Sequence, residues 1–234
     1  MASVLSDAGN SCRGWVAMDL FEDDTRNSEV RKESLAAGAS VLRNLARGRA
    51  HELLDAINGV LEAAPPRNML IPGGARMSVA MSNCGPLGWV SDRRGYRYEA
   101  LDPLSQRPWP GMPAIFMALA EEAATLAGFP GFRPDACLIN RYQAGARMAL
   151  HQDRDEPDLG APIVSVSLGL PATFLFGGRT RSEKPISIPL GHGDVVVWGG
   201  PSRLAFHGVR PLKPGDHALT GPCRYNLTLR RAGS

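Results

Sequence analysis

The second half of the chain limits the fold most, because short β-rich segments follow one another there without a helical segment between them. Gly, Pro and Asp separate these segments after Gly128. Parallel strands need long crossover connections, which are usually helices. We therefore expect an antiparallel sandwich or barrel. The predicted strands are 136–142, 163–170, 173–176, 186–190, 195–198 and 225–229.

Two helices are predicted before these strands. Apolar residues recur at helical spacing from about residue 46 to 64, and Pro65-Pro66 ends that pattern. A second helix is expected over 113–127, because Pro113 suits a first helical position and Gly128 suits the position after the end. The fold class expected is mainly β with flanking helices.

The region between the two helices is predicted as strand and loop. A strand is expected at 77–81, followed by a Gly-rich loop that carries an aromatic cluster with interleaved arginines. Before the first helix, residues 1–35 are polar and are expected to form an N-terminal arm that is partly flexible. Residues 36–234 are expected to form a single domain, which suits a chain of 234 residues.

Composition excludes some classes of protein. Charged residues make up 21% of the chain, and no apolar run approaches the ~20 residues of a membrane helix. The four cysteines form no C-x-x-C pair, and the first residues do not resemble a signal peptide. We expect reduced thiols, a cytoplasmic location and no membrane partner. The net charge of +3 does not by itself indicate a nucleic-acid partner.

One pattern is typical of a metal site. His151 and Asp153 are alternate residues at the end of an expected strand, so both can face one centre. With His207 as third ligand they would form the two-histidine, one-carboxylate triad of non-haem Fe(II) oxygenases. A lone His-x-Asp is more often structural, and His192, in a Gly-His-Gly turn, is the strongest competitor. The remaining histidines are assigned to structure or solvent: His51, His192 and His217.

A second pattern is a strand with an arginine at each end of one face. Arg224 and Arg230 have Cα atoms ~20 Å apart on an extended strand, and Asn226 and Thr228 lie between them on the same face. Two arginines leaning inward could hold a short dicarboxylate, although a solvated face is the usual alternative. Asn140 and Tyr142 share a face of another strand and could donate to an anion. 

The order N-x-Y, H-x-D, a distant His and R-x-N-x-T-x-R resembles the AlkB family of Fe(II)- and 2-oxoglutarate-dependent dioxygenases. The resemblance runs from about Asp19 to Ala232. It implies a double-stranded β-helix (jelly roll) core. The strings that carry it are MSVAM, NCG-x-LGW, DACLINRY, HQD-x-DEPDL, APIVSVSLGLPA, HGDVVVWGG and CRYNLT.

The resemblance also implies roles for individual residues. The implied iron ligands are His151, Asp153 and His207. The implied 2-oxoglutarate pocket consists of Asn140, Tyr142, Arg224, Asn226 and Arg230, with Arg224 on the far carboxylate and Arg230 nearer the metal. The implied methylated-base pocket consists of Trp89, Tyr96 and Arg181, with Met81 beside them and Asp155 facing the base edge. A nucleotide-recognition lid would span about 66–112, in which Ile71 and Ala75 depart from the family pattern.

The implied activity is direct reversal of N-alkylation damage in DNA. Oxidative demethylation of 1-methyladenine and 3-methylcytosine, in single- or double-stranded DNA, would consume 2-oxoglutarate and O₂ at Fe(II) and release formaldehyde, succinate and CO₂. Two alternatives remain open at this point: a demethylase of RNA or tRNA, and a non-catalytic module that binds damaged bases. No obligate protein partner is evident.

Overall fold

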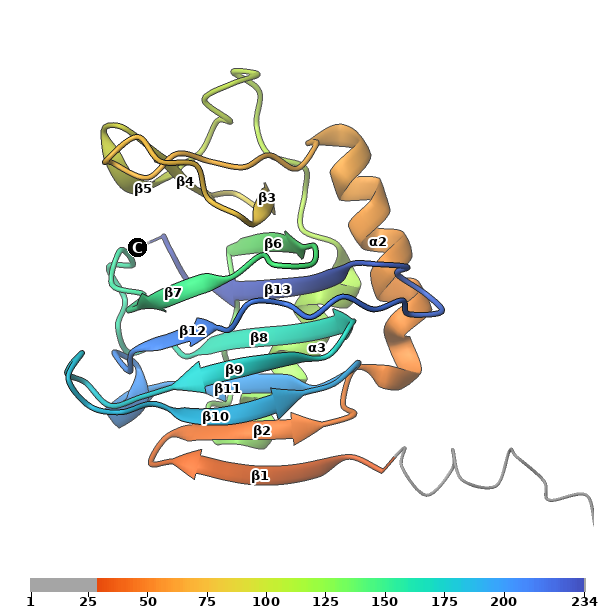
Figure 1. Cartoon of the computed structure of the whole chain (residues 1–234), viewed down its shortest axis with the longest axis vertical. Coiled ribbons are helices and arrows are strands. Elements are labelled where there is room, and N and C mark those ends of the chain that lie inside the picture. The colour runs from red at the N-terminus through yellow and green to blue at the C-terminus, as the bar shows by residue number, and fades with distance from the viewer. Residues whose placement is uncertain (1–28, 234) are drawn as a thin grey trace, which may run out of the picture.

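Two antiparallel sheets form the body of the protein in a computed structural model that describes residues 29–233 (Figure 1). The larger sheet has seven strands in the order β1-β2-β11-β8-β13-β6-β3, and the smaller has four in the order β10-β9-β12-β7. The larger sheet contains β1 (Arg31–Ala36), β2 (Ala39–Arg43), β11 (Val195–Trp198), β8 (Ile163–Gly169), β13 (Arg224–Arg230), β6 (Ala136–Tyr142) and β3 (Ala80–Cys84). The smaller contains β10 (Ile186–Leu190), β9 (Ala172–Phe176), β12 (His207–Val209) and β7 (Met148–His151).

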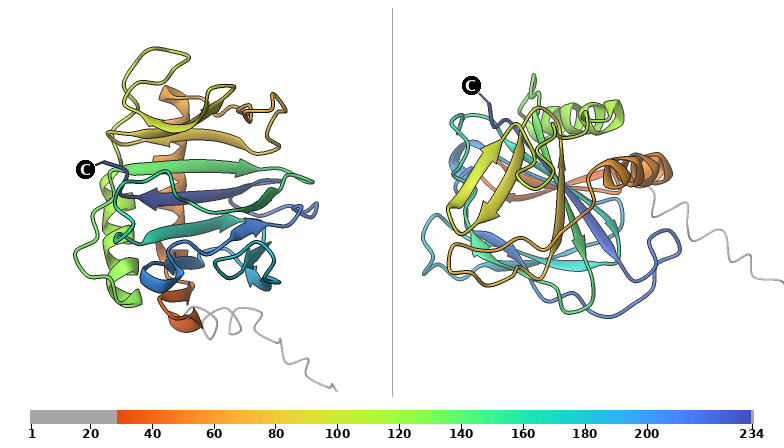
Figure 2. Two further views of the ribbon diagram at one scale, coloured as in Figure 1. Left: turned by 90° about the vertical axis from the view of Figure 1, so that its left-hand side faces the viewer. Right: turned by 90° about the horizontal axis from the view of Figure 1, so that it is seen from above.

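Both long helices cover the same side of this body (Figure 2). They are α2 (Ala50–Ala63) and α3 (Ala114–Ala127), close to the predicted ranges. The short helices η1 (Arg47–Arg49) and η2 (Gly200–Ser202) connect other elements. Gly128 follows α3 with φ of 100°, which favours glycine, and its N–H caps the helix. Among residues 29–233, none of the helices has the length and apolar character of a membrane-spanning segment.

Alternation along β13 divides the interior into two layers. Leu227 and Leu229 pack with the helices in one hydrophobic cluster, while Arg224, Asn226 and Arg230 face a cavity between the sheets. A strand paired on both sides must present alternate side chains to opposite faces, so the polar residues are directed inward to the cavity. The predicted mainly β fold with a jelly-roll core and flanking helices is confirmed.

Residues 80–99 differ from the prediction. The strand expected at 77–81 is β3, which begins at Ala80, and the expected Gly-rich loop is a hairpin of β4 (Gly88–Asp92) and β5 (Gly95–Glu99). Gly95 has φ of 122° at the turn. Tyr96 and Tyr98 alternate with Arg97 as strand residues do, but this alternation covers too few positions to predict a strand. The hairpin lies next to β3, beyond the edge of the larger sheet (Figure 1).

The larger sheet includes residues that were assigned to the N-terminal arm. The arm was expected to reach residue 35, but β1 occupies Arg31–Ala36 and pairs with β2, whose residues Val41 and Leu42 are buried. The chain reverses at Gly38, where φ is 77° and an added Cβ would lie 2.4 Å from a backbone oxygen. Residues 1–28, the rest of the expected arm, lie outside the described residues.

Candidate metal centre and adjoining pocket

Strand register brings His151 and His207 together. They are paired residues of the antiparallel strands β7 and β12, and their ring centroids are 4.3 Å apart. Asp153 follows in the loop after β7, with Oδ1 3.6 Å from His151 Nε2 and Oδ2 3.7 Å from His207 Nε2. One ligand atom from each residue lies within 4.8 Å of the others, so the three could hold one metal ion.

Backbone contacts orient both imidazole rings. His151 Nδ1 lies 2.8 Å from the carbonyl oxygen of Ala149, and His207 Nδ1 lies 3.0 Å from that of Ala205. A carbonyl can only accept, so each Nδ1 carries the proton and each Nε2 presents its lone pair to the centre. Burial lowers the pKa of His207 to about 4, which keeps its ring neutral at neutral pH.

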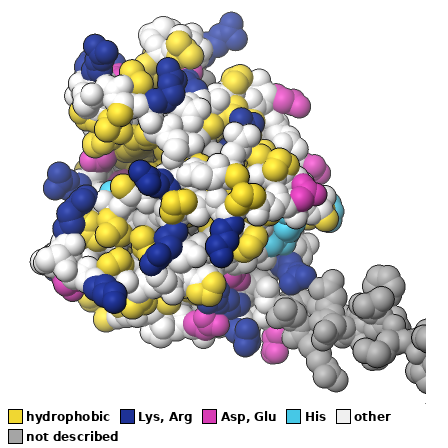
Figure 3. Space-filling model, in the orientation of Figure 1, with side chains coloured by type: hydrophobic (Ala, Val, Ile, Leu, Met, Phe, Trp, Pro, Cys, Tyr) yellow, Lys and Arg dark blue, Asp and Glu magenta, His cyan; other side chains and the backbone are white. Residues whose placement is uncertain are grey.

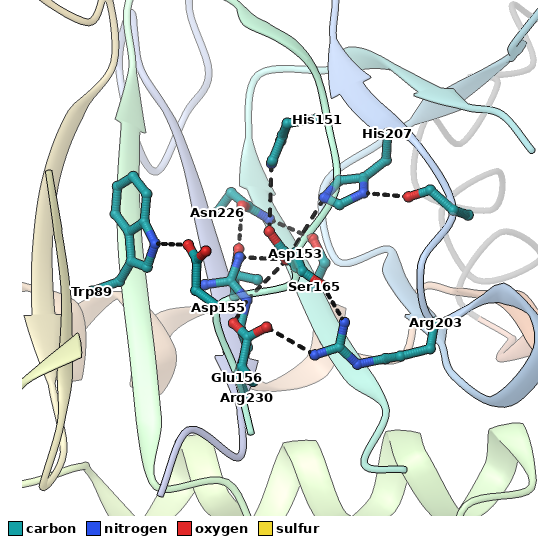
Figure 4. A network of polar contacts seen from close by, with 12 residues as sticks. Trp89, His151, Asp153, Asp155, Glu156, Ser165, Arg203, His207, Asn226 and Arg230 are labelled. Atoms are coloured by element: carbon teal, nitrogen blue, oxygen red, sulfur yellow. Dashed lines mark hydrogen bonds and ion pairs between the residues drawn. The ribbon is translucent and has the colours of Figure 1, made fainter. Parts of the chain in front are cut away.

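Asp153 is held ionised by an arginine. Its Oδ2 accepts hydrogen bonds from Arg230 Nε at 2.9 Å and from Arg230 Nη2 at 2.6 Å (Figure 4). Burial is the largest single influence and raises the pKa of the Asp153 carboxyl. The charge and hydrogen bonds of Arg230, together with the nearby His207 and His151, outweigh it and hold the pKa below its usual range. The centre therefore combines two imidazole Nε2 atoms with one carboxylate, a donor set that suits Fe(II).

A cavity adjoins this centre between the two sheets. All residues predicted for a 2-oxoglutarate pocket line it, together with both histidines of the centre and with residues such as Ser165 and Trp198. Register explains the convergence, since Arg224 pairs with Tyr142 and Asn226 pairs with Asn140 across β13 and β6. The residues predicted for that pocket are Asn140, Tyr142, Arg224, Asn226 and Arg230.

Arg224 is a buried cation without a carboxylate partner among the described residues. It is 1% exposed, its Nη2 donates to Ser167 Oγ at 2.9 Å, and its guanidinium lies 5.0 Å from the centroid of the Tyr142 ring. Its Nε and Nη1 have no hydrogen-bond partner in residues 29–233. Burial lowers the pKa of Arg224. Buried donors of a charged group are rarely left unpaired, so this end of the cavity suits an anion.

The residues predicted for a base pocket meet only in part. Trp89 Nε1 donates to Asp155 Oδ2 at 3.1 Å, and the Trp89 ring stacks on Tyr96 with centroids 5.5 Å apart. Arg181 lies nearby, because its Nη2 donates to the carbonyl of Leu150, the residue before His151. Met81 is 1% exposed on β3, within the hydrophobic cluster between the sheets.

Three charged or polar residues beside the centre were not singled out from the sequence. Tyr98 on β5 donates to Glu156 Oε1 at 2.5 Å, and Arg203 Nη2 donates to Glu156 Oε2 at 3.0 Å. Glu156 is 4% exposed and Arg203 is 3% exposed. The acidic run after Asp153 was the only available signal, because it places carboxylates next to an expected ligand.

Comparisons with known proteins agree with this geometry. A family profile described as the 2OG-Fe(II) oxygenase superfamily matches residues 38–230. The chain is 57% identical over 216 residues to the alpha-ketoglutarate-dependent dioxygenase AlkB of Escherichia coli, covering 92% of this chain and 98% of that protein. It is 33% identical over 139 residues to the tRNA demethylase abh1 of Schizosaccharomyces pombe, covering 58% and 46% respectively. The solved structure of OsALKBH1 superposes with a TM-score of 0.75 at 28% identity, covering 86% of this chain and 100% of that chain.

Proposed function

The chain belongs to the 2OG-Fe(II) oxygenase superfamily, and we propose that it removes alkyl groups from 1-methyladenine and 3-methylcytosine in DNA by oxidative demethylation. It is a dioxygenase that depends on Fe(II), 2-oxoglutarate and O₂. The observation that carries the substrate proposal is the Trp89–Asp155 contact. It brings the aromatic face of Trp89 to the carboxylate of Asp155, which lies two residues along the chain from Asp153.

His151, Asp153 and His207 would hold the iron. Their fit is supported by the two Nε2 lone pairs and the ionised carboxylate that converge within 4.8 Å. When bound, iron, 2-oxoglutarate and O₂ would supply the oxidation of a methyl carbon, with succinate and CO₂ as the by-products and formaldehyde as the released one-carbon product. The protein positions the reactants and shields the site, as is general for cofactor enzymes.

Arg224 and Arg230 would hold the two ends of 2-oxoglutarate. The unpaired Nε and Nη1 of Arg224 support its contact with the carboxylate far from the metal. Arg230 already contacts Asp153, so it lies at the metal end of the same strand. Asn140, Tyr142 and Asn226 line the space between the two arginines. A dicarboxylate in this space would pair the buried charge of Arg224.

A flipped base would lie against Trp89. Base recognition outside the duplex uses stacking on flat side chains and hydrogen bonds to the base edge, and Asp155 would accept from an exocyclic amine. Tyr96 and Arg181 flank this position. Met81 is buried in the hydrophobic cluster against which Trp89 packs, so it would support the pocket from that cluster. The lid would comprise residues 66–112, in which the small Ala75 and the apolar Ile71 leave fewer polar contacts to the nucleotide.

Basic side chains support a nucleic-acid substrate. Lys and Arg side chains are spread over the face of Figure 1, both on the hairpin and on the sheets below it (Figure 3). Such side chains contact phosphates without regard to sequence. The cysteines in the described part of the chain are free thiols, Cys84, Cys137 and Cys223, which supports a cytoplasmic place of action.

RNA is the second candidate substrate, favoured by the similarity to the S. pombe tRNA demethylase. A non-catalytic binding module is disfavoured by the complete His151–Asp153–His207 triad. The substrates separate in one experiment: the protein is mixed with Fe(II), ascorbate, 2-oxoglutarate and matched DNA or RNA oligonucleotides that carry 1-methyladenine or 3-methylcytosine, and loss of the methyl mass is followed.

Faster methyl loss from DNA, abolished by Asp153→Ala, is the expected result. Faster loss from RNA would replace the DNA proposal with the RNA one. Turnover of 2-oxoglutarate to succinate without methyl loss from either oligonucleotide would contradict both.

A further inference from the structure

Arg203 contacts the loop that carries Asp153 at three separate points. The side chain follows η2 and precedes His207 by four residues. Its Nη1 donates to the backbone carbonyl of Asp153 at 2.6 Å, and its Nε donates to that of Ala161 at 2.9 Å. Its Nη2 donates to the Glu156 carboxylate at 3.0 Å. Figure 4 shows Arg203 and Glu156 together on one side of Asp153.

The loop needs such external contacts. Residues 152–162 connect β7 to β8 and contain neither helix nor strand. Without ladder hydrogen bonds, the backbone of Asp153 depends on side chains for its position. A guanidinium is planar and presents its donors in a fixed fork, so one Arg203 side chain fixes the start, middle and end of the loop relative to the strand that bears His207.

Glu156 links Arg203 to the carboxylate side of Asp153. Arg230 Nε lies 3.4 Å from Glu156 Oε1, and the same guanidinium donates to Asp153 Oδ2. Asp153 is thus approached from two directions: Arg203 holds its backbone, and Arg230 holds its carboxylate. Glu156, at 4% exposed, carries the negative charge that lets both arginines remain buried nearby.

We propose that Arg203 is a positioning residue, which sets the distance between Asp153 and His207 by its three contacts with the 152–162 loop. The inference rests on the proposed function, because it takes Asp153 and His207 as metal ligands. Partners that orient metal ligands commonly contribute ~10- to 100-fold to metal affinity. Lysine could not replace arginine here, because one ammonium on a flexible stem cannot meet the three acceptors in the same fixed geometry.

The test measures Co(II) affinity of the metal-free protein by titration calorimetry, without substrate or turnover, beside the melting temperature of each variant. Arg203→Lys keeps the charge beside Glu156 and removes the fork. Arg43→Lys is the matched control, because Arg43 also uses three nitrogens on Glu33, Asp194 and the Pro189 carbonyl, away from the centre. We expect Arg203→Lys to weaken Co(II) binding ~10- to 100-fold and Arg43→Lys to leave it unchanged.

The outcomes are separable. Parental Co(II) affinity in Arg203→Lys would overturn the proposal, and so would equal weakening in both lysine variants, since that would be a general effect of lost stability. If Arg203→Lys does not fold, Glu156→Gln tests the same contacts and should weaken Co(II) a few-fold. Parental affinity in that variant would also overturn the proposal. Failure of the unaltered protein to bind Co(II) would instead contradict the metal site itself.

Discussion

Two pairs of histidines with nearly the same ring separation lie near opposite ends of β13. The rings of His151 and His207 are 4.3 Å apart beside Asp153, which Arg230 contacts at the end of the strand. The rings of His192 and His217 are 4.5 Å apart. The second pair lies by the start of the strand, because His192 contacts Gly169, which pairs with Arg224.

The hydrogen bonds of the rings distinguish the two pairs. In the first pair each Nδ1 faces a carbonyl oxygen and must donate. In the second pair each Nδ1 accepts a backbone N–H, from Gly169 for His192 and from Leu219 for His217. A neutral ring that accepts at Nδ1 carries its proton at Nε2, so the second pair presents donors where the first presents lone pairs. The distance between two histidines therefore does not identify a metal site, whereas the groups that face their other nitrogens do.

The largest expected effect comes from removing members of the first pair. His151→Ala, His207→Ala and Asp153→Ala should each weaken metal binding by more than about 100-fold, since even partners of a ligand contribute ~10- to 100-fold. Turnover should be lost with little loss of fold. Calorimetric titration with Co(II) and the melting temperature of the metal-free variants measure both effects.

His192→Ala and His217→Ala are the matched controls, and they should bind Co(II) as the unaltered protein does. Turnover within tenfold of the parent in Asp153→Ala would contradict the assignment of the metal to the first pair. So would loss of metal binding in His192→Ala.

The next effect concerns Arg224, which lies at the end of β13 near the second pair of histidines. Arg224→Ala should weaken 2-oxoglutarate binding ~10- to 100-fold, because a hydrogen bond to a charged group contributes roughly 1.5–3 kcal/mol. The 2-oxoglutarate requirement for succinate formation measures this. Arg210→Ala, which removes an exposed arginine bonded to Ser187, is the control. An unchanged requirement in Arg224→Ala would show that the anion lies elsewhere.

Trp89→Ala separates base recognition from the metal end. Base–aromatic stacking contributes about 1–3 kcal/mol, so use of a methylated oligonucleotide should fall ~5- to 150-fold. Decay of 2-oxoglutarate without substrate should be nearly unchanged. Within the described residues the Trp89 ring hydrogen-bonds to Asp155 and stacks on Tyr96, and it makes no such contact with a metal ligand.

Trp109→Ala is the contrasting variant, because Trp109 is 6% exposed and its Nε1 donates to the Glu99 carbonyl. It should lower the melting temperature. If Trp89→Ala lowers both reactions equally together with the melting temperature, Trp89 belongs to the core.

The smallest expected effect concerns His192 and pH. Burial lowers the pKa of His192 from 6.5 to about 4, with a further contribution from His217. The unfolded chain therefore binds the proton more tightly, and the free energy of unfolding should fall as pH drops from about 6.5 to about 4. The slope from one group is at most about 1.4 kcal/mol per pH unit. Urea unfolding of His192→Gln should show a shallower fall than the parent, and an identical fall would contradict this environment for His192.

Sequence patterns predicted those parts of the molecule that depend on local alternation. The face of Arg224, Asn226 and Arg230 was predicted from period two alone, and the structure directs it into the cavity. The end of α3 at Gly128 was predicted from its conformational preference. These features depend on neighbours along the chain.

The triad of His151, Asp153 and His207 was predicted although His207 is distant in the sequence, but other features that depend on distant partners were not. The hairpin of β4 and β5 was missed because its stabilising contacts, such as Tyr98 with Glu156, join residues from separate elements. No sequence pattern singled out Arg203, because its three acceptors are brought together only by the path of the 152–162 loop. The hydrogen bond from Gly169 that sets the tautomer of His192 likewise exists only in the folded chain.

Anomalous scattering from crystals grown with Mn(II) tests the central claim most directly, because it places the ion relative to both histidine pairs in one experiment. We expect a strong peak between His151 Nε2, His207 Nε2 and the Asp153 carboxylate, and none beside His192 and His217. A peak at the second pair, or none at the first in crystals that contain the metal, would contradict it.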